Sequence, residues 1–282
     1  MKNVKCISFL LAIALMIGII GCRNNATSPV EESIESSQDN ALAEGEMTSV
    51  FSFFDAQSET TFQSGIKGDN ATILVSPKKS ELLPDCATAS WDSVARILTI
   101  DFGSQNCVCK DGLTRRGKII AQFSGKYKEV NSSVMISLDN YYVQDMKVTG
   151  SKKVTFLGVG KVNILVENAM VATPTGTISW NSNRTIEKTK GLTTPTIWDD
   201  EYVLTGSANG VNRKGVAFTV TIDTPLKKKV SCLAKDFVSG ILTIQNDKGA
   251  TLSINYDPLG TEACNKLASV TINGKTQTIT LR

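Results

Sequence analysis

Histidine is absent from the 282-residue sequence. Its absence excludes Ser-His-Asp and Cys-His catalysis, and it excludes zinc or haem held by histidine. An enzyme of this composition would depend on carboxylates, lysine, tyrosine or a metal held by oxygen atoms. The sequence therefore predicts a non-enzymatic protein with no catalytic residue and no cofactor.

Long apolar runs are also scarce, and the conspicuous one spans only residues 7–20. It is shorter than the roughly 18 residues that cross a bilayer. Lys2 and Lys5 precede it, and Gly21 and Cys22 follow it. A basic flank, a short apolar core and a small residue before the cleavage position are typical of a secretory signal peptide, here residues 1–21.

The sequence Ile-Ile-Gly-Cys at residues 19–22 resembles the lipobox of bacterial lipoproteins. The resemblance implies cleavage before Cys22 and acylation, palmitate included, of its sulfur and new amino terminus. Several acyl chains together make membrane anchoring durable. An ordinary signal peptide that carries a cysteine there is the alternative.

Large apolar residues are scarce in residues 23–45, which are rich in Ser, Asn and Glu. Such composition is typical of a chain that does not fold alone, so residues 22–45 are predicted to be a lipidated cysteine and a flexible acidic tether. Residues 22–62 have a net charge of −7 and residues 63–282 one of +8. The basic surplus indicates a solvated surface, with anionic glycans or lipid head groups as the alternative partners. No nucleic-acid partner is predicted.

From Thr72 onward, apolar and polar residues alternate with a period of two, as in Ile119, Ala121 and Phe123. Turn signals separate the alternating runs, and Asn273-Gly274 predicts a two-residue hairpin. The pattern predicts a mainly β fold, an antiparallel meander in a curved sheet or sandwich. Residues 46–282 form one large domain in this interpretation, with subdomains 46–190 and 191–282 as the alternative.

Residues 46–57 depart from this period, because their apolar residues fall at i, i+3, i+4 and i+7: Met47, Val50, Phe51 and Phe54. This spacing predicts one short amphipathic helix that lies on the sheet.

Cysteine usage fits an exported protein, in which disulfides are expected. Five cysteines remain beyond Cys22, namely Cys86, Cys107, Cys109, Cys232 and Cys264. Spacing alone does not choose among the possible pairings. Local pairing favours Cys86 with Cys107 or Cys109, and Cys232 with Cys264.

Two similar stretches, DGLTRRG at residues 111–117 and NGVNRKG at residues 209–215, raise the question of a phosphate-binding loop. Neither opens a helix, and the glycine spacing of phosphate loops is missing. Both are predicted to be tight turns, with Arg115 and Arg213 as strand-end or cross-strand partners. A second echo, LDNYYV at 138–143 and VENAMV at 166–171, places an acid-Asn pair inside each of two strands.

Several motifs in order, among them LTIDFGSQNC, TRRGKIIAQFSGKY, DDEYVLTGSANGVNRKGVAFTVTIDTPL and ASVTINGKTQTITLR, resemble an uncharacterised family of Bacteroidota lipoproteins over residues 86–282. The resemblance implies a Gram-negative cell envelope, the outer membrane in particular, and an all-β body. It also implies cysteines at positions 86, 107, 232 and 264, from which Cys109 is a departure. It implies no reaction.

The densest acidic cluster, residues 198–202, offers Asp199 and Glu201 as candidate calcium ligands or glycosidase carboxylates. Trp91, Trp180 and Trp198 are candidates for stacking on a sugar, although packing in the core is more common.

These observations predict a lipid-anchored, non-enzymatic binding or structural module of the outer membrane, on its periplasmic or surface-exposed face. Its partners would be the membrane, and glycans or other envelope proteins. A carrier of lipid or another apolar ligand, and a carbohydrate-binding or carbohydrate-active protein, are the alternatives.

Overall fold

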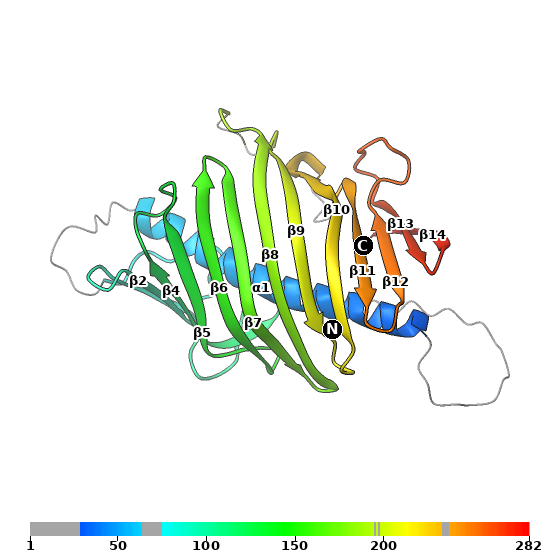
Figure 1. Cartoon of the computed structure of the whole chain (residues 1–282). Coiled ribbons are helices and arrows are strands. Elements are labelled where there is room, and N and C mark those ends of the chain that lie inside the picture. Colours follow the sequence, from blue (N-terminus) through cyan, green and yellow to red (C-terminus); the bar gives the residue numbers. More distant parts are fainter. Residues whose placement is uncertain (1–28, 64–74, 195, 197, 233–236, 282) are drawn as a thin grey trace, which may run out of the picture.

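The computed structural model describes residues 29–63, 75–194, 196, 198–232 and 237–281. A long helix lies across one open antiparallel sheet of 14 strands (Figure 1). The elements are α1 (Pro29–Gln63), β1 (Thr88–Asp92), β2 (Ile97–Asp101), β3 (Cys107–Val108), β4 (Thr114–Phe123), β5 (Ser133–Val143), β6 (Met146–Gly158), β7 (Lys161–Thr173), β8 (Gly176–Lys190), β9 (Glu201–Val211), β10 (Ala217–Lys229), the 3₁₀ turn η1 (Val230–Cys232), β11 (Ser239–Asn246), β12 (Thr251–Asn255), β13 (Leu267–Ile272) and β14 (Lys275–Thr280).

The sheet is a meander in which nearly every strand pairs with its neighbour in sequence. Only β3 lies off this path, paired with the start of β4. The predicted fold class, mainly β with one helix, is confirmed, and so is the hairpin at Asn273-Gly274. One sheet continues from β8 to β9, so the strands do not separate at residue 190.

The helix is much longer than the predicted segment 46–57, and the tether prediction is wrong for residues 29–45, which are helical. Buried residues recur along α1 every three or four positions, but many of them are small or polar, such as Ser33, Ser36 and Asn40. An apolar periodicity search does not detect such a stripe, because its period is carried by hydroxyl and amide side chains. Residues 1–28, including the predicted signal peptide and Cys22, lie outside the described residues.

The sheet bends around α1 along a line of β-bulges and glycines that crosses the strands from β4 to β7, which we name the crease. Asn140 in β5 and Asn168 in β7 have positive φ angles of 46° and 53°, and the strand register shifts at both. The residues opposite them are glycines: a Cβ on Gly117 would lie 2.1 Å from the Asn140 carbonyl oxygen, and one on Gly150 would lie 2.6 Å from Ala169 Cα. The repeated acid-Asn motif therefore marks bulges, which add local twist and curvature.

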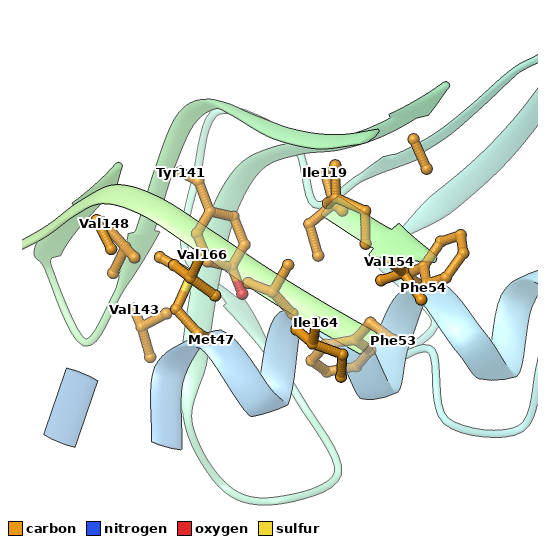
Figure 2. Packing of buried hydrophobic residues seen from close by; sticks show 14 of the residues in the cluster. Met47, Phe53, Phe54, Ile119, Tyr141, Val143, Val148, Val154, Ile164 and Val166 are labelled. Atoms are coloured by element: carbon orange, nitrogen blue, oxygen red, sulfur yellow. The ribbon is translucent and has the colours of Figure 1, made fainter. Parts of the chain in front are cut away.

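The core lies between the concave face of the sheet and the middle of α1. Figure 2 shows Met47, Phe53 and Phe54 of the helix against side chains of the central strands, among them Ile119 and Val166. Most inward residues of the central strands are apolar and most outward residues are polar, so these strands bury one face.

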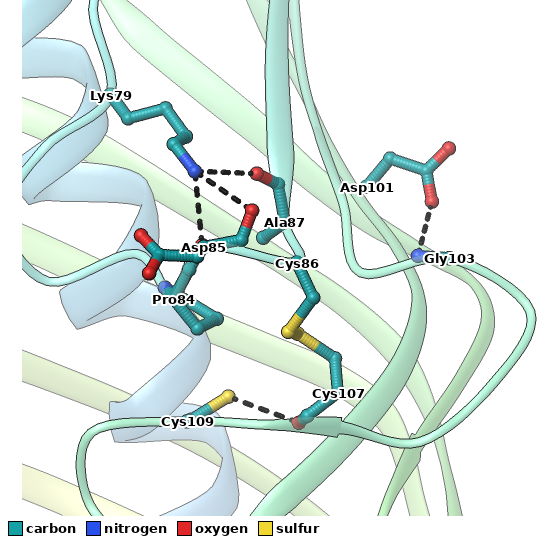
Figure 3. The surroundings of a disulfide bond; sticks show 9 residues. All are labelled: Lys79, Pro84, Asp85, Cys86, Ala87, Asp101, Gly103, Cys107 and Cys109. Atoms are coloured by element: carbon teal, nitrogen blue, oxygen red, sulfur yellow. Dashed lines mark hydrogen bonds between the residues drawn. A yellow bond between two sulfur atoms is a disulfide. The ribbon is translucent and has the colours of Figure 1, made fainter.

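Two disulfides join segments at the margins of the sheet. Cys86 bonds to Cys107 and ties the segment before β1 to β3, and Cys232 bonds to Cys264 and ties the end of β10 to the β12–β13 loop. Figure 3 shows the first of these bonds beside Cys109, which is free, buried and close to the Cys107 carbonyl oxygen. Both local pairings agree with the prediction, and Cys107 is the partner that spacing alone left open.

Candidate functional site

Two of the three candidate stacking tryptophans are buried, so that prediction is wrong for them. Trp91 is 4% exposed and packs against the rings of Phe62 and Phe123. Trp180 is 2% exposed, and its Nε1 donates a hydrogen bond of 2.9 Å to Asn40 Oδ1 on α1. Trp198, by contrast, is 57% exposed on the β8–β9 loop. It is the one member of the three that can reach a ligand.

The acidic cluster beside Trp198 is engaged in contacts within the protein. Asp199 accepts a hydrogen bond of 3.0 Å from Thr194, and Glu201 pairs with Lys190 at 2.7 Å. The described residues hold no group of three His, Cys, Asp or Glu side chains placed to bind a metal ion. Asp199 and Glu201 therefore do not converge on a shared calcium site, because each points to a different partner.

Asp200, which lies between them, is the buried acid of the cluster. It pairs with Lys188 at 2.8 Å and accepts a hydrogen bond of 3.0 Å from the Tyr202 hydroxyl. Burial, together with this carboxylate, raises the pKa of Tyr202 to about 12. The contacts of Asp200 thus tie the start of β9 to β8.

The concave face of the sheet is a binding surface that α1 already occupies. The helix carries eight acidic residues and no basic one. Most of them meet basic or polar groups of the sheet: Glu32 with Lys248, Glu35 with Arg213 and Lys214, Asp39 with Arg213, Glu44 with Arg184, Asp55 with the Tyr127 hydroxyl, and Glu59 with Lys128. The opposite charges of residues 22–62 and 63–282 are therefore partly matched inside the molecule.

Each stretch contains a turn, at residues 110–112 and 213–215, where Gly112 and Gly215 have φ angles of 81°, but the two turns fall at different positions of the aligned stretches. Their arginines, however, bind the helix. Arg213 donates from its backbone N–H and from Nε to Asp39, each at 2.7 Å. Arg115 pairs with Asp111, donates to Ser49 at 3.0 Å and lies over the Phe53 ring. The arginine shared by the two stretches was the available signal, but Arg115 lies in β4 and Arg213 lies in a turn, and only the structure shows their partners.

Two buried basic side chains, Lys152 and Arg184, lie at the same interface. Lys152 donates a hydrogen bond to the Met47 carbonyl oxygen, and Arg184 lies near Glu44 at 3.3 Å. Burial lowers the pKa of Lys152 to about 7, although Glu44 opposes the shift. Burial also raises the pKa of Glu46 on the adjoining turn of α1. These groups are enclosed by the helix and cannot meet a ligand while α1 is in place.

Two shallow hollows lie on the convex face, away from α1. One follows the crease and includes Arg116, Lys118 and Tyr142. Its cations are already paired, because Arg116 stacks on Tyr142 and binds Asp145, while Lys118 pairs with Asp101 at 3.3 Å. The other hollow crosses β8–β11 and is lined by amide and hydroxyl groups such as Asn209 and Thr219. The first hollow holds charges of both signs, Asp101 and Asp139 beside Arg116 and Lys118, and the second also includes apolar residues such as Val211 and Phe218.

The two ends of the strands differ sharply. In a meander, alternate connections lie at the same end of the sheet, so the β4–β5, β6–β7, β8–β9 and β12–β13 connections share one end (Figure 1). This end, which we name the apolar rim, displays the exposed side chains Val130, Leu157, Val159, Leu192, Trp198 and Leu259.

The turns at the opposite end are short and polar. Between β5 and β14, these turns present no exposed large apolar side chain among the described residues. Val108 of β3 is exposed near that end but outside those turns.

The comparisons with known proteins identify no matching family model, no similar curated protein and no similar solved structure. Among the described residues, no helix is both long enough and apolar enough to cross a membrane.

Proposed function

We propose that this protein is exported, anchored through lipid at Cys22 in a bacterial outer membrane, and serves as a non-enzymatic binding module. The observation that carries the proposal is the position of α1, which fills the concave face of the sheet. The surfaces left to a partner are the convex face and the apolar rim. Two disulfides are consistent with an oxidising compartment and therefore with export.

The anchor is tested by mass spectrometry of the intact protein isolated from envelopes. We expect a mature chain that begins at Cys22 and carries acyl groups, because the sequence before it has the features of a lipoprotein signal. Cys22→Ser should abolish both acylation and cleavage, so that the variant keeps its apolar run at residues 7–20. Cys6→Ser, in the predicted signal peptide, is the matched control and should change neither. An unmodified amino terminus in the wild-type protein would contradict the proposal.

Carbohydrate binding is the second candidate, and the exposure of Trp198 favours it. An indole on a loop offers a flat apolar surface of the kind on which sugar rings stack. A polysaccharide array is the test: retention should fall when Trp198 becomes Ala. The carrier alternative has no such observation in its favour, since an apolar ligand would have to displace α1 from the core.

A further inference from the structure

We infer that the apolar rim is a membrane-contacting surface whose loop tips enter the head-group region of a lipid bilayer. The inference goes beyond the proposed lipid anchor and does not rest on it.

The first argument is the way in which the apolar side chains are displayed. Val159 is 83% exposed at the tip of the β6–β7 turn, and Trp198 projects from the β8–β9 loop. Leu192 lies beside the β6–β7 turn, because a Cβ on Gly160 would come within 2.7 Å of its Cδ2 atom. Val130 and Leu259 project from loops further along the same end. A protein partner would need a separate pocket for each distant tip, whereas a fluid lipid interface accepts each one independently.

The second argument is the regularity of the pattern. Single exposed apolar residues are ordinary on protein surfaces. Here they recur on four connections at one end of the sheet, while the turns at the other end are polar. Because the ends of neighbouring strands form a continuous margin, a broad flat surface can touch several of these loops together.

The third argument is the chemistry of the surrounding side chains. Three lysines near the tips are paired with carboxylates: Lys161 with Glu187, Lys188 with Asp200 and Lys190 with Glu201. Tryptophan is favoured at membrane–water interfaces, where its ring is apolar and its N–H remains hydrated. Since the charges are balanced, attraction to anionic lipid is not the main driving force. The rim should therefore bind zwitterionic lipid with little dependence on salt.

The rim and the start of α1 lie at opposite ends of the sheet. Glu32, near the start of the helix, pairs with Lys248 in the β11–β12 turn. A strand of 13 residues such as β6 spans about 40 Å, whereas residues 22–28 reach about 25 Å at most. The tether is therefore shorter than the sheet, so the rim and the anchor are separate contacts that an upright sheet cannot bring to the same bilayer together, and the two can be tested apart.

The experiment uses residues 22–282 with Cys22→Ser, produced without the predicted signal peptide, so that neither an acyl group nor the apolar run at residues 7–20 contributes. Flotation with phosphatidylcholine vesicles measures binding, with and without an anionic lipid. Vesicles with brominated acyl chains quench tryptophans that enter the bilayer. Because Trp91 and Trp180 are buried, quenching reports on Trp198. We expect flotation, quenching of the Trp198 share of the fluorescence, and similar binding at low and high salt.

The double variant Val159→Ser/Trp198→Ala should lower vesicle binding about tenfold or more. Circular dichroism should show the same thermal transition as the parent, because both side chains are exposed. Val108→Ser is the matched control: it removes an exposed valine of the other end and should leave binding unchanged.

Three results would overturn the inference. The first is no flotation of the parent, or equal flotation of parent and double variant. The second is sedimentation that shows dimers lost in the double variant without vesicle binding, which would make the rim an interface between copies. The third is polysaccharide retention that depends on Trp198 while vesicles do not bind, which would assign the tryptophan to sugar recognition. Failure of acylation at Cys22 would leave the inference standing, since the test chain carries no lipid.

Discussion

The middle of α1 and its N-terminal half are buried against the same sheet by opposite chemistry. The middle presents Met47, Val50, Phe53 and Phe54 to an apolar core. The N-terminal half presents acids, serines and Asn40 to Arg213, Lys248 and Trp180. The comparison teaches that a helix can be held along its whole length although only its middle is amphipathic in the usual sense.

The two chemistries differ in what they contribute. Apolar burial favours docking in any register that hides the same surface. Hydrogen-bonded ion pairs such as Asp39–Arg213 contribute less net free energy after desolvation, but an unpaired partner is costly. We therefore expect the middle of α1 to supply most of the stability and the N-terminal half to fix where the helix lies.

The largest effect should come from Phe54→Ala. The Phe54 side chain is fully buried and contacts the rings of Phe123 and Tyr127. Its removal leaves a cavity, and we expect a loss of about 3–5 kcal/mol in the free energy of unfolding, measured by denaturant titration. Phe51→Ala is the control and should cost less, because Phe51 is only partly buried. A loss below about 1 kcal/mol for Phe54→Ala would show that the middle of α1 is not the main source of stability.

A smaller loss, about 2–4 kcal/mol, is expected for Arg213→Met in the same titration. The substitution leaves the carboxylate of Asp39 buried without its cation. Lys214→Met is the control: this lysine pairs with Glu35 but is half exposed, so its removal should cost about 1 kcal/mol or less.

A double variant, Asp39→Leu with Arg213→Met, tests whether the unpaired, buried carboxylate of Asp39 causes the loss of stability. It should recover part of the loss, because it removes the buried charge as well as its partner. If the double variant is as unstable as the sum of its two single variants, desolvation of Asp39 is not the cause.

The smallest effect concerns pH and lies where the two regions of α1 meet. The folded protein holds the pKa of Lys152 at about 7, against 10.5 in the unfolded chain. Between these values the unfolded chain binds more protons, so the free energy of unfolding should rise with pH, by up to about 1.4 kcal/mol per pH unit from this group. Glu44, which pairs with Arg184 at 3.3 Å, is the charged group that opposes the shift.

Lys152→Met should remove this part of the slope, and denaturant titrations at pH 7, 8 and 9 would measure it. Lys153→Met is the control, since Lys153, the next residue in β6, faces outward. Equal slopes for the wild type and Lys152→Met would contradict a buried, neutral lysine.

The strands were predictable because their alternation reports directly on one buried face, and the local disulfides followed from chain proximity. The N-terminal half of α1 was not predictable, because a segment rich in residues such as Ser36 and Asp39 is also typical of a flexible tether. Only the structure shows that these two residues bind Asn212 and Arg213. Trp91 and Trp180 were equally ambiguous, since tryptophan is frequent both in cores and on binding surfaces. The apolar rim was not predicted, because the sequence left open how the strands are arranged, and only the observed single meander places those loops at one end.

The Glu32–Lys248 contact joins residues separated by 216 positions. The helix is synthesised before the strands, yet Lys248 lies in the turn between β11 and β12, near the end of the sheet. Contacts of such long sequence separation slow folding, because a large loop must close before they form. A nascent chain halted before β11 would thus carry the acidic helix without Lys248, the partner of Glu32. The complete set of helix–sheet contacts can form only after almost the entire polypeptide has emerged.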